Sequence, residues 1–153
     1  MGKEIERKFL VTDSAFRLMA RESIAIRQAY ISVNPDATVR VRVGGDMAWL
    51  TVKGRNHGAE RDEWEWPITV DEACEMADRL AGGWSIDKTR YLVDWQGRTW
   101  EVDEFHGRHE GLVLAEVELP TADADVELPP FVGMEVTGDP AYYNSTLSAA
   151  HNS

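Results

Sequence analysis

The chain is poor in residues that bind metals through sulfur or imidazole. Cys74 is its only cysteine, so an intramolecular disulfide is excluded and a thiolate metal site is not expected. Of its four histidines, His106 and His109 flank a Gly-Arg pair in a stretch that we expect to form an exposed turn. Any metal ion bound by this protein should therefore have oxygen ligands.

Long hydrophobic runs and excess positive charge are also missing. No apolar run approaches the roughly 18 residues of a membrane span. The charged N-terminus does not resemble a signal peptide, so we expect no membrane partner and a cytoplasmic location. Its 16 Lys and Arg against 27 Asp and Glu give a formal charge of −11, which argues against nucleic-acid binding. The absence of a GxxxxGK[ST] loop excludes a P-loop enzyme.

Short strands dominate what is present. The 153 residues, 43% of them hydrophobic, fit a single domain over residues 1–153. β-branched and aromatic residues recur at every second position in eight stretches, and turn residues such as Gly44-Gly45 favour antiparallel pairing of neighbours. The predicted strands cover residues 3–11, 23–33, 37–43, 47–54, 60–69, 84–95, 98–106 and 112–119. Capping and turn residues predict three helices, at residues 13–20, 70–80 and 140–149.

Charged residues recur at every second position of these strands. A single strand of this kind usually has one solvated face. Here, however, like charges lie about 7 Å apart along the same strand and repel one another. The eight acids and six bases at these positions have a net charge of −2, whereas the rest of the chain has a net charge of −9. A nearly neutral charged face on a strongly acidic protein suits a site that is separate from the outer surface. The positions are Glu4/Glu6 with Lys8, Arg40/Arg42, Lys53, Glu63/Glu65, Lys88/Arg90, Glu101/Asp103 and Glu116/Glu118.

A closed sheet explains this pattern. Closing eight strands removes the sheet edges and creates an interior, and in some barrels that interior is polar and holds a ligand. The sequence thus predicts a mainly β (α+β) fold, an eight-stranded antiparallel β-barrel or tunnel with a charged interior and flanking helices. The apolar faces would point outward, where helices would bury Trp64, Trp66 and Val102.

The interior charges match a metal-bound polyanion. Arginine forks bind phosphate oxygens bidentately and lysines supply point charges, so the basic residues predict several phosphates. The carboxylates then need divalent cations, and oxygen ligands without Cys or His favour Mg²⁺ or Mn²⁺. The predicted partner is a small-molecule triphosphate.

The ordered motifs resemble the CYTH superfamily of triphosphate tunnel metalloenzymes. Similarity to the compact bacterial members that hydrolyse inorganic tripolyphosphate to pyrophosphate and phosphate implies an eight-stranded tunnel and a divalent-metal-dependent triphosphatase. The matching stretches are the ExExK motif at 4–8, VRVRV at 39–43, LTVKG at 50–54, RDEWEW at 61–66, DKTRY at 87–91, EVDEF at 101–105, AEVEL at 115–119 and GMEVTGDPAYYN at 133–144.

The resemblance also implies a role for each motif residue. Glu63 and Glu65 would serve a second metal or hold the basic residues in place. Lys88 would orient or activate the attacking water, and activation by the metal or by a carboxylate is an equal alternative. Triphosphate ligands would be Lys8, Arg40, Arg42, Lys53, Lys88 and Arg90, and metal ligands would be Glu4, Glu6, Glu101, Asp103, Glu116 and Glu118.

The C-terminal stretch AYYNSTLSAAH departs from the family pattern. Several relatives carry a lysine in this helix, whereas this chain has neither Lys nor Arg there. It would still plug one tunnel mouth through Tyr142, Tyr143 and Leu147. A class IV adenylate cyclase, a thiamine triphosphatase and a non-catalytic polyphosphate- or nucleotide-binding module stay open as alternatives, and so does a homodimer.

Overall fold

Nine strands form one antiparallel sheet in residues 2–148, the part of the chain that the computed structural model describes. The eight predicted strands are all present, and each strand end either agrees with the prediction or differs from it by one residue. The strands are β1 (Gly2–Val11), β2 (Glu22–Asn34), β3 (Ala37–Gly44), β4 (Met47–Lys53), β5 (Glu60–Ile68), β6 (Ser85–Trp95), β7 (Arg98–Phe105), β8 (Val113–Glu118) and β9 (Val132–Glu135).

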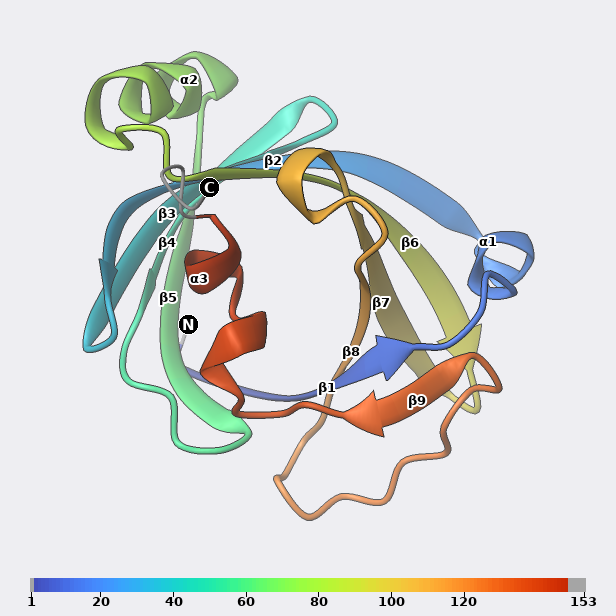
Figure 1. Ribbon diagram of the computed structural model, residues 1–153. Helices are drawn as coiled ribbons and strands as arrows, with labels where there is room; N and C mark the ends of the chain where they lie inside the picture. The colour runs from blue at the N-terminus through green and yellow to red at the C-terminus, as the bar shows by residue number, and fades with distance from the viewer. Residues whose placement is uncertain (1, 149–153) are drawn as a thin grey trace.

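Eight of these strands close into a barrel, which confirms the predicted fold. The strand order is β5-β4-β3-β2-β6-β7-β8-β1, and β5 also pairs with β1, so the sheet has no free edge within this ring (Figure 1). Directly paired residues share a face of a sheet. Pairs such as Lys53 with Glu63, and Arg90 with Asp103, therefore place the alternating charges on the inner face.

The ninth strand was not predicted. β9 continues the sheet beside the end of β1, where Phe9 pairs with Glu135 and Val11 with Val132. Its four residues are too few to show a period-two pattern, and tertiary pairing with β1 decides their conformation. β9 brings the C-terminal segment back to the barrel.

The helices lie outside the ring or across one of its ends. Helix α2 (Val70–Leu80) matches the prediction, whereas α1 (Phe16–Met19) is only the second half of the predicted helix 13–20. A short η1 (Gly107–His109) joins β7 to β8. No helix in residues 2–148 is long and apolar enough to cross a bilayer.

The predicted helix 140–149 is wrong for the residues that the structure describes. The segment forms two short turns, η2 (Pro140–Tyr142) and α3 (Asn144–Leu147), while Ala149 lies outside the described residues. Tyr143 between them is extended, with φ −69° and ψ 137°, which interrupts a continuous helix. The break allows the Tyr143 and Asn144 side chains to reach polar partners in the barrel.

Outward-facing apolar residues form the walls, and helices cover only part of them. Val102 is fully buried, as predicted. Trp64 and Trp66, however, are 40% and 43% exposed, so their predicted burial is wrong. Helix α2 packs mainly against β2, β3 and β4, and of β5 it covers the end near Ile68 rather than the two tryptophans.

Helix α2 begins with a capping box that should contribute measurably to stability. The Thr69 hydroxyl accepts a hydrogen bond from the Glu72 backbone N–H, and the Glu72 carboxylate accepts one from the Thr69 N–H. We expect Thr69→Ala to lower the free energy of unfolding by about 1 kcal/mol in urea denaturation. Thr121→Ala, at an exposed loop position, is the control and should change it by less than about 0.5 kcal/mol. Equal effects of the two substitutions would contradict the role of the cap.

Candidate active site

The barrel encloses a charged cavity of about 370 Å³. Twelve of the fourteen predicted site residues line it, and the other two, Glu65 and Asp103, bind basic residues of the same interior face. Residues far apart in the sequence thus meet because every strand turns its alternate charged side chains inward. The twelve are Glu4, Glu6, Lys8, Arg40, Arg42, Lys53, Glu63, Lys88, Arg90, Glu101, Glu116 and Glu118.

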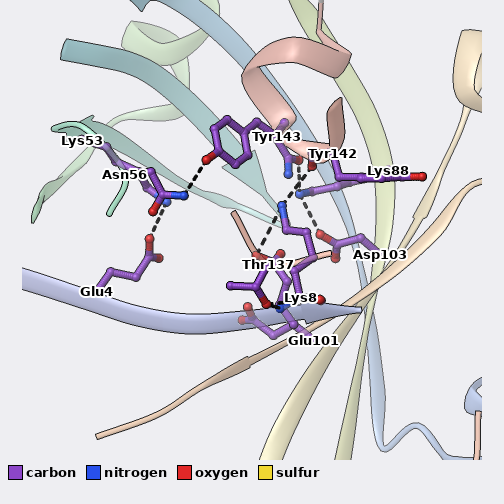
Figure 2. A network of polar contacts seen from close by, with 12 residues as sticks. Glu4, Lys8, Lys53, Asn56, Lys88, Glu101, Asp103, Thr137, Tyr142 and Tyr143 are labelled. Atoms are coloured by element: carbon purple, nitrogen blue, oxygen red, sulfur yellow. Dashed lines mark hydrogen bonds and ion pairs between the residues drawn. The ribbon is translucent and has the colours of Figure 1, made fainter. Parts of the chain in front are cut away.

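Acidic and basic residues alternate around the wall of the cavity. The Lys53 Nζ lies 2.9 Å from a Glu4 oxygen and 3.6 Å from Glu63 (Figure 2 shows the first of these contacts). Arg42 lies 3.4 Å from Glu65, which also accepts a 2.8 Å hydrogen bond from Thr51. Opposite charges from other strands of the barrel therefore offset the repulsion between like charges along one strand.

Asp103 is the most deeply buried of the predicted acids. It is 1% exposed, and its two oxygens accept hydrogen bonds from Arg90 Nε and Nη2 at 2.8 and 2.9 Å. Lys88 Nζ lies 2.8 Å from the same carboxylate (Figure 2). Burial alone would raise the pKa of Asp103, but Arg90 and Lys88 hold it below its ordinary value. This geometry suits an anion that positions two cations.

The basic residues lie close enough to repel one another, although nearby acidic groups, against the effect of burial, hold the pKa of Arg40, Lys53 and Arg90 above its usual value. Burial lowers the pKa of Arg42 to about 10, and the neighbouring Arg40 and Arg90 act in the same direction. Burial also lowers the pKa of Lys88 to about 8, with Asp103 opposing the change. The Nε of Arg40 is buried and has no hydrogen-bond partner within residues 2–148. A bound polyanion would both reduce this repulsion and satisfy Arg40.

Glu6 and Glu116 form a hydrogen-bonded carboxyl pair. Burial and the neighbouring Glu116 raise the pKa of Glu6 well above its usual range. Burial would also raise the pKa of Glu116, but Lys8, the hydrogen bond with Glu6 and Arg90 hold it well below. The raised pKa of Glu6 thus reflects burial and repulsion between the two carboxylates, and a divalent cation bound here would relieve that repulsion. In the described part of the chain no three carboxylates are already gathered as a metal cluster.

The C-terminal segment closes one mouth of the cavity, as predicted, but it does so through polar as well as apolar contacts. The Lys8 Nζ donates to the Tyr142 carbonyl at 3.0 Å (Figure 2). The Lys88 Nζ donates to the Asn144 side-chain oxygen at 2.8 Å. Leu147 packs into an apolar cluster with Phe105 and Leu114. Two predicted phosphate ligands therefore contact this segment directly.

The sequence analysis missed several residues that line the cavity. Arg61 was not predicted, although it lies two residues before Glu63 and four before Glu65 on the same strand. The alternation of charged residues therefore already indicated that Arg61 faces the cavity. Thr137 accepts a 2.9 Å hydrogen bond from the Lys8 backbone N–H, and Asn144 binds Lys88. Strand alternation does not mark these last two, because they reach the cavity through the return of the chain after β9, but both lie in the matching stretch GMEVTGDPAYYN at 133–144, which was the available signal.

Comparison with known proteins places this fold and site in a family. The family model for the CYTH domain matches residues 2–148. The chain belongs to the CYTH domain family. An inorganic triphosphatase of Acetivibrio thermocellus is 49% identical to this CYTH domain over 147 residues, which cover 96% of this chain and 94% of that protein. An inorganic triphosphatase of Nitrosomonas europaea is 36% identical over 151 residues, or 95% and 96% of the two chains.

A solved structure supports the same assignment for the CYTH domain. The crystal structure of an inorganic triphosphatase superposes with a TM-score of 0.65 at 33% identity, and the match covers 95% of this chain and 93% of that one. The family and the tunnel fold that the sequence predicted are thereby confirmed. The roles of individual site residues stay predictions.

Proposed function

We propose that this CYTH domain hydrolyses inorganic tripolyphosphate to pyrophosphate and phosphate with the help of Mg²⁺ or Mn²⁺. The observation that carries the proposal is that Arg40, Arg42, Arg90 and Lys88 line one cavity that acids also line. Binding a polyanion alone requires no such set of carboxylates. The names of the two relatives point to the same substrate.

The basic residues would bind and orient the triphosphate chain. Arg40, Arg42 and Arg90 offer guanidinium forks, and Lys8 and Lys53 add point charges on the facing strands. Glu63 and Glu65 would hold Lys53 and Arg42 in place, as their ion pairs suggest. Asp103 would do the same for Lys88 and Arg90 in addition to, or in place of, its predicted role as a metal ligand.

The carboxylates fit a divalent cation. Glu6 and Glu116 line the cavity from the paired strands β1 and β8, where a metal would reduce the repulsion between their carboxylates, and Glu4, Glu101 and Glu118 line the same cavity. When bound, the metal would neutralise phosphate charge and polarise the attacking water. Water would attack a terminal phosphorus in line with the leaving oxygen, so that one P–O bond forms, one breaks and pyrophosphate departs. The chain's contribution is mainly positioning and charge neutralisation.

Lys88 should make the binding of tripolyphosphate depend on pH. Its pKa of about 8 means that Lys88 is a cation at neutral pH and loses its charge as the pH rises through 8. We expect the affinity for tripolyphosphate, measured by calorimetry in EDTA, to weaken over this range. Lys88→Met should bind more weakly at pH 7 and lose this dependence. If instead turnover rises through pH 8 and Lys88→Arg abolishes that rise, Lys88 acts as the general base.

The function itself is tested by product analysis with purified protein. Tripolyphosphate, ATP and thiamine triphosphate are compared side by side with Mg²⁺, with Mn²⁺ and with EDTA. EDTA-sensitive release of orthophosphate, selective for tripolyphosphate, is the expected result. Formation of cyclic AMP and pyrophosphate from ATP would indicate a cyclase. Selective turnover of thiamine triphosphate would indicate a thiamine triphosphatase. Tight binding without turnover would indicate a non-catalytic module.

A further inference from the structure

One cation of the cavity lies outside the predicted triphosphate ligands. Arg61 is on the inner face of β5, beside the mouth that the C-terminal segment closes, and lines the cavity with Thr38, Asn56 and Tyr143. The guanidinium carbon lies 5.9 Å from the centre of the Tyr143 ring. Asn56 Nδ2 donates to the Tyr143 hydroxyl at 2.6 Å (Figure 2). These four residues are called the Arg61 site below.

Arg61 differs from most cations of the cavity because its charge is not paired. Its Nε donates to the Gly54 carbonyl at 2.7 Å and its Nη2 to the Thr38 hydroxyl at 3.0 Å, both neutral acceptors. Within residues 2–148 it forms no ion pair, although Glu4 is its partner across the strands, because the Glu4 carboxylate binds Lys53. The Nη1 group has no hydrogen-bond partner among the same residues. An unpaired arginine facing an enclosed space favours an anion.

The position of Arg61 extends the row of predicted phosphate ligands. Thr38, which binds Arg61, precedes Arg40 by two residues on β3, so both point into the cavity. The same cavity is lined by Arg42, Arg40, Arg61 and Tyr143. A linear phosphate chain bound to the arginines could therefore continue by one group toward this end.

We propose that the Arg61 site binds one further phosphate of a linear polyphosphate, so that the tunnel prefers inorganic tetrapolyphosphate to tripolyphosphate. The inference rests on the proposed triphosphate site, since that site holds the rest of the chain. Arg61 supplies the charge and the Nη1 donors, and Asn56 and the Tyr143 hydroxyl surround the terminal group. The subsite thus determines the preferred length of the substrate.

Calorimetry in EDTA tests the proposal without turnover. The wild-type protein should bind tetrapolyphosphate more tightly than tripolyphosphate by roughly tenfold or more, the value of one charge-assisted hydrogen bond. Arg61→Gln should reduce the preference to within about threefold, and Arg61→Lys, which keeps the charge, should restore part of it. The matched control is Arg55→Gln, because Arg55 lies on the connection that leads to β5 but is exposed and pairs with Asp36, and it should leave the preference intact.

The outcomes separate this inference from the proposed function. If Arg61→Gln weakens the binding of both anions equally, Arg61 acts only through its hydrogen bonds to Gly54 and Thr38, and the proposed subsite is wrong. A wild-type protein without the preference, or one that binds neither anion, would overturn it too. If the preference depends on Arg61 but tripolyphosphate is not hydrolysed with Mg²⁺ or Mn²⁺, the subsite stands and the hydrolytic function fails. If tripolyphosphate is hydrolysed but the preference is missing, the hydrolytic function stands and the subsite fails.

Discussion

Replacing Asp103 with Asn should lower the free energy of unfolding by about 3 kcal/mol, because a buried ion pair that loses one partner leaves an uncompensated charge. Asp103 is 1% exposed and is the shared partner of Lys88 and Arg90. Asparagine keeps the shape but removes the negative charge. The loss should stay near the lower end of the range for such pairs, since Lys88 already has a lowered pKa and can release its proton.

Urea denaturation at pH 7 measures this loss. Asp94→Asn is the matched control, because Asp94 pairs with Arg21 at 2.8 Å but is 58% exposed, and it should cost less than about 1 kcal/mol. Tripolyphosphate added in EDTA should stabilise Asp103→Asn more than the wild type, because the anion then neutralises Lys88 and Arg90. An Asp103→Asn protein as stable as the wild type would show that the carboxylate is not the anchor of these two cations.

The charge alternation of single strands was enough to predict the barrel and most of its interior. Arg40 and Arg42, or Glu116 and Glu118, share a face whatever surrounds them, because the period of a strand is two residues. The closed ring then followed from the need to give so many inward charges partners of opposite sign. The structure supplies those partners across strands, as between Lys53 and Glu63.

The features that the sequence did not predict depend on contacts between distant segments. Trp64 and Trp66 have the same alternation as buried residues, and their exposure follows only from the position of α2 over β2, β3 and β4. Likewise, the segment after β9 has a helical pattern, but Tyr143 and Asn144 bind barrel residues and break it. Local propensity is a weak guide where tertiary contacts compete with it.

These two failures bear on function in different ways. The exposed tryptophans lie on the outer wall, so the error leaves the predicted site unchanged. The broken C-terminal helix is part of the site, because Tyr142 and Asn144 accept hydrogen bonds from Lys8 and Lys88. Phosphate oxygens would compete with these acceptors, which makes this end of the tunnel the place where this chain can differ from relatives that carry a lysine there.

Glu116→Gln should lower kcat/KM for tripolyphosphate by roughly 100-fold to 1,000-fold, the usual cost of removing a preorganised electrostatic group. Glu116 is 8% exposed, lies 3.9 Å from Lys8 and 4.0 Å from Arg90, and its proximity helps to raise the pKa of Glu6. Glutamine keeps the shape and can donate a hydrogen bond to Glu6, so the barrel should fold. It cannot, however, supply the negative charge that a divalent cation requires.

Titration of Mg²⁺ and Mn²⁺ in the turnover assay distinguishes the two ways in which Glu116 could act. If it is a metal ligand, the concentration of metal at half-maximal rate should rise at least about tenfold in Glu116→Gln. Glu110→Gln, at an exposed position outside the cavity, is the control and should match the wild type in both rate and metal dependence. An unchanged metal requirement with a higher KM would contradict the ligand role. Glu116 would then act by holding Lys8 and Arg90 in place for the phosphates.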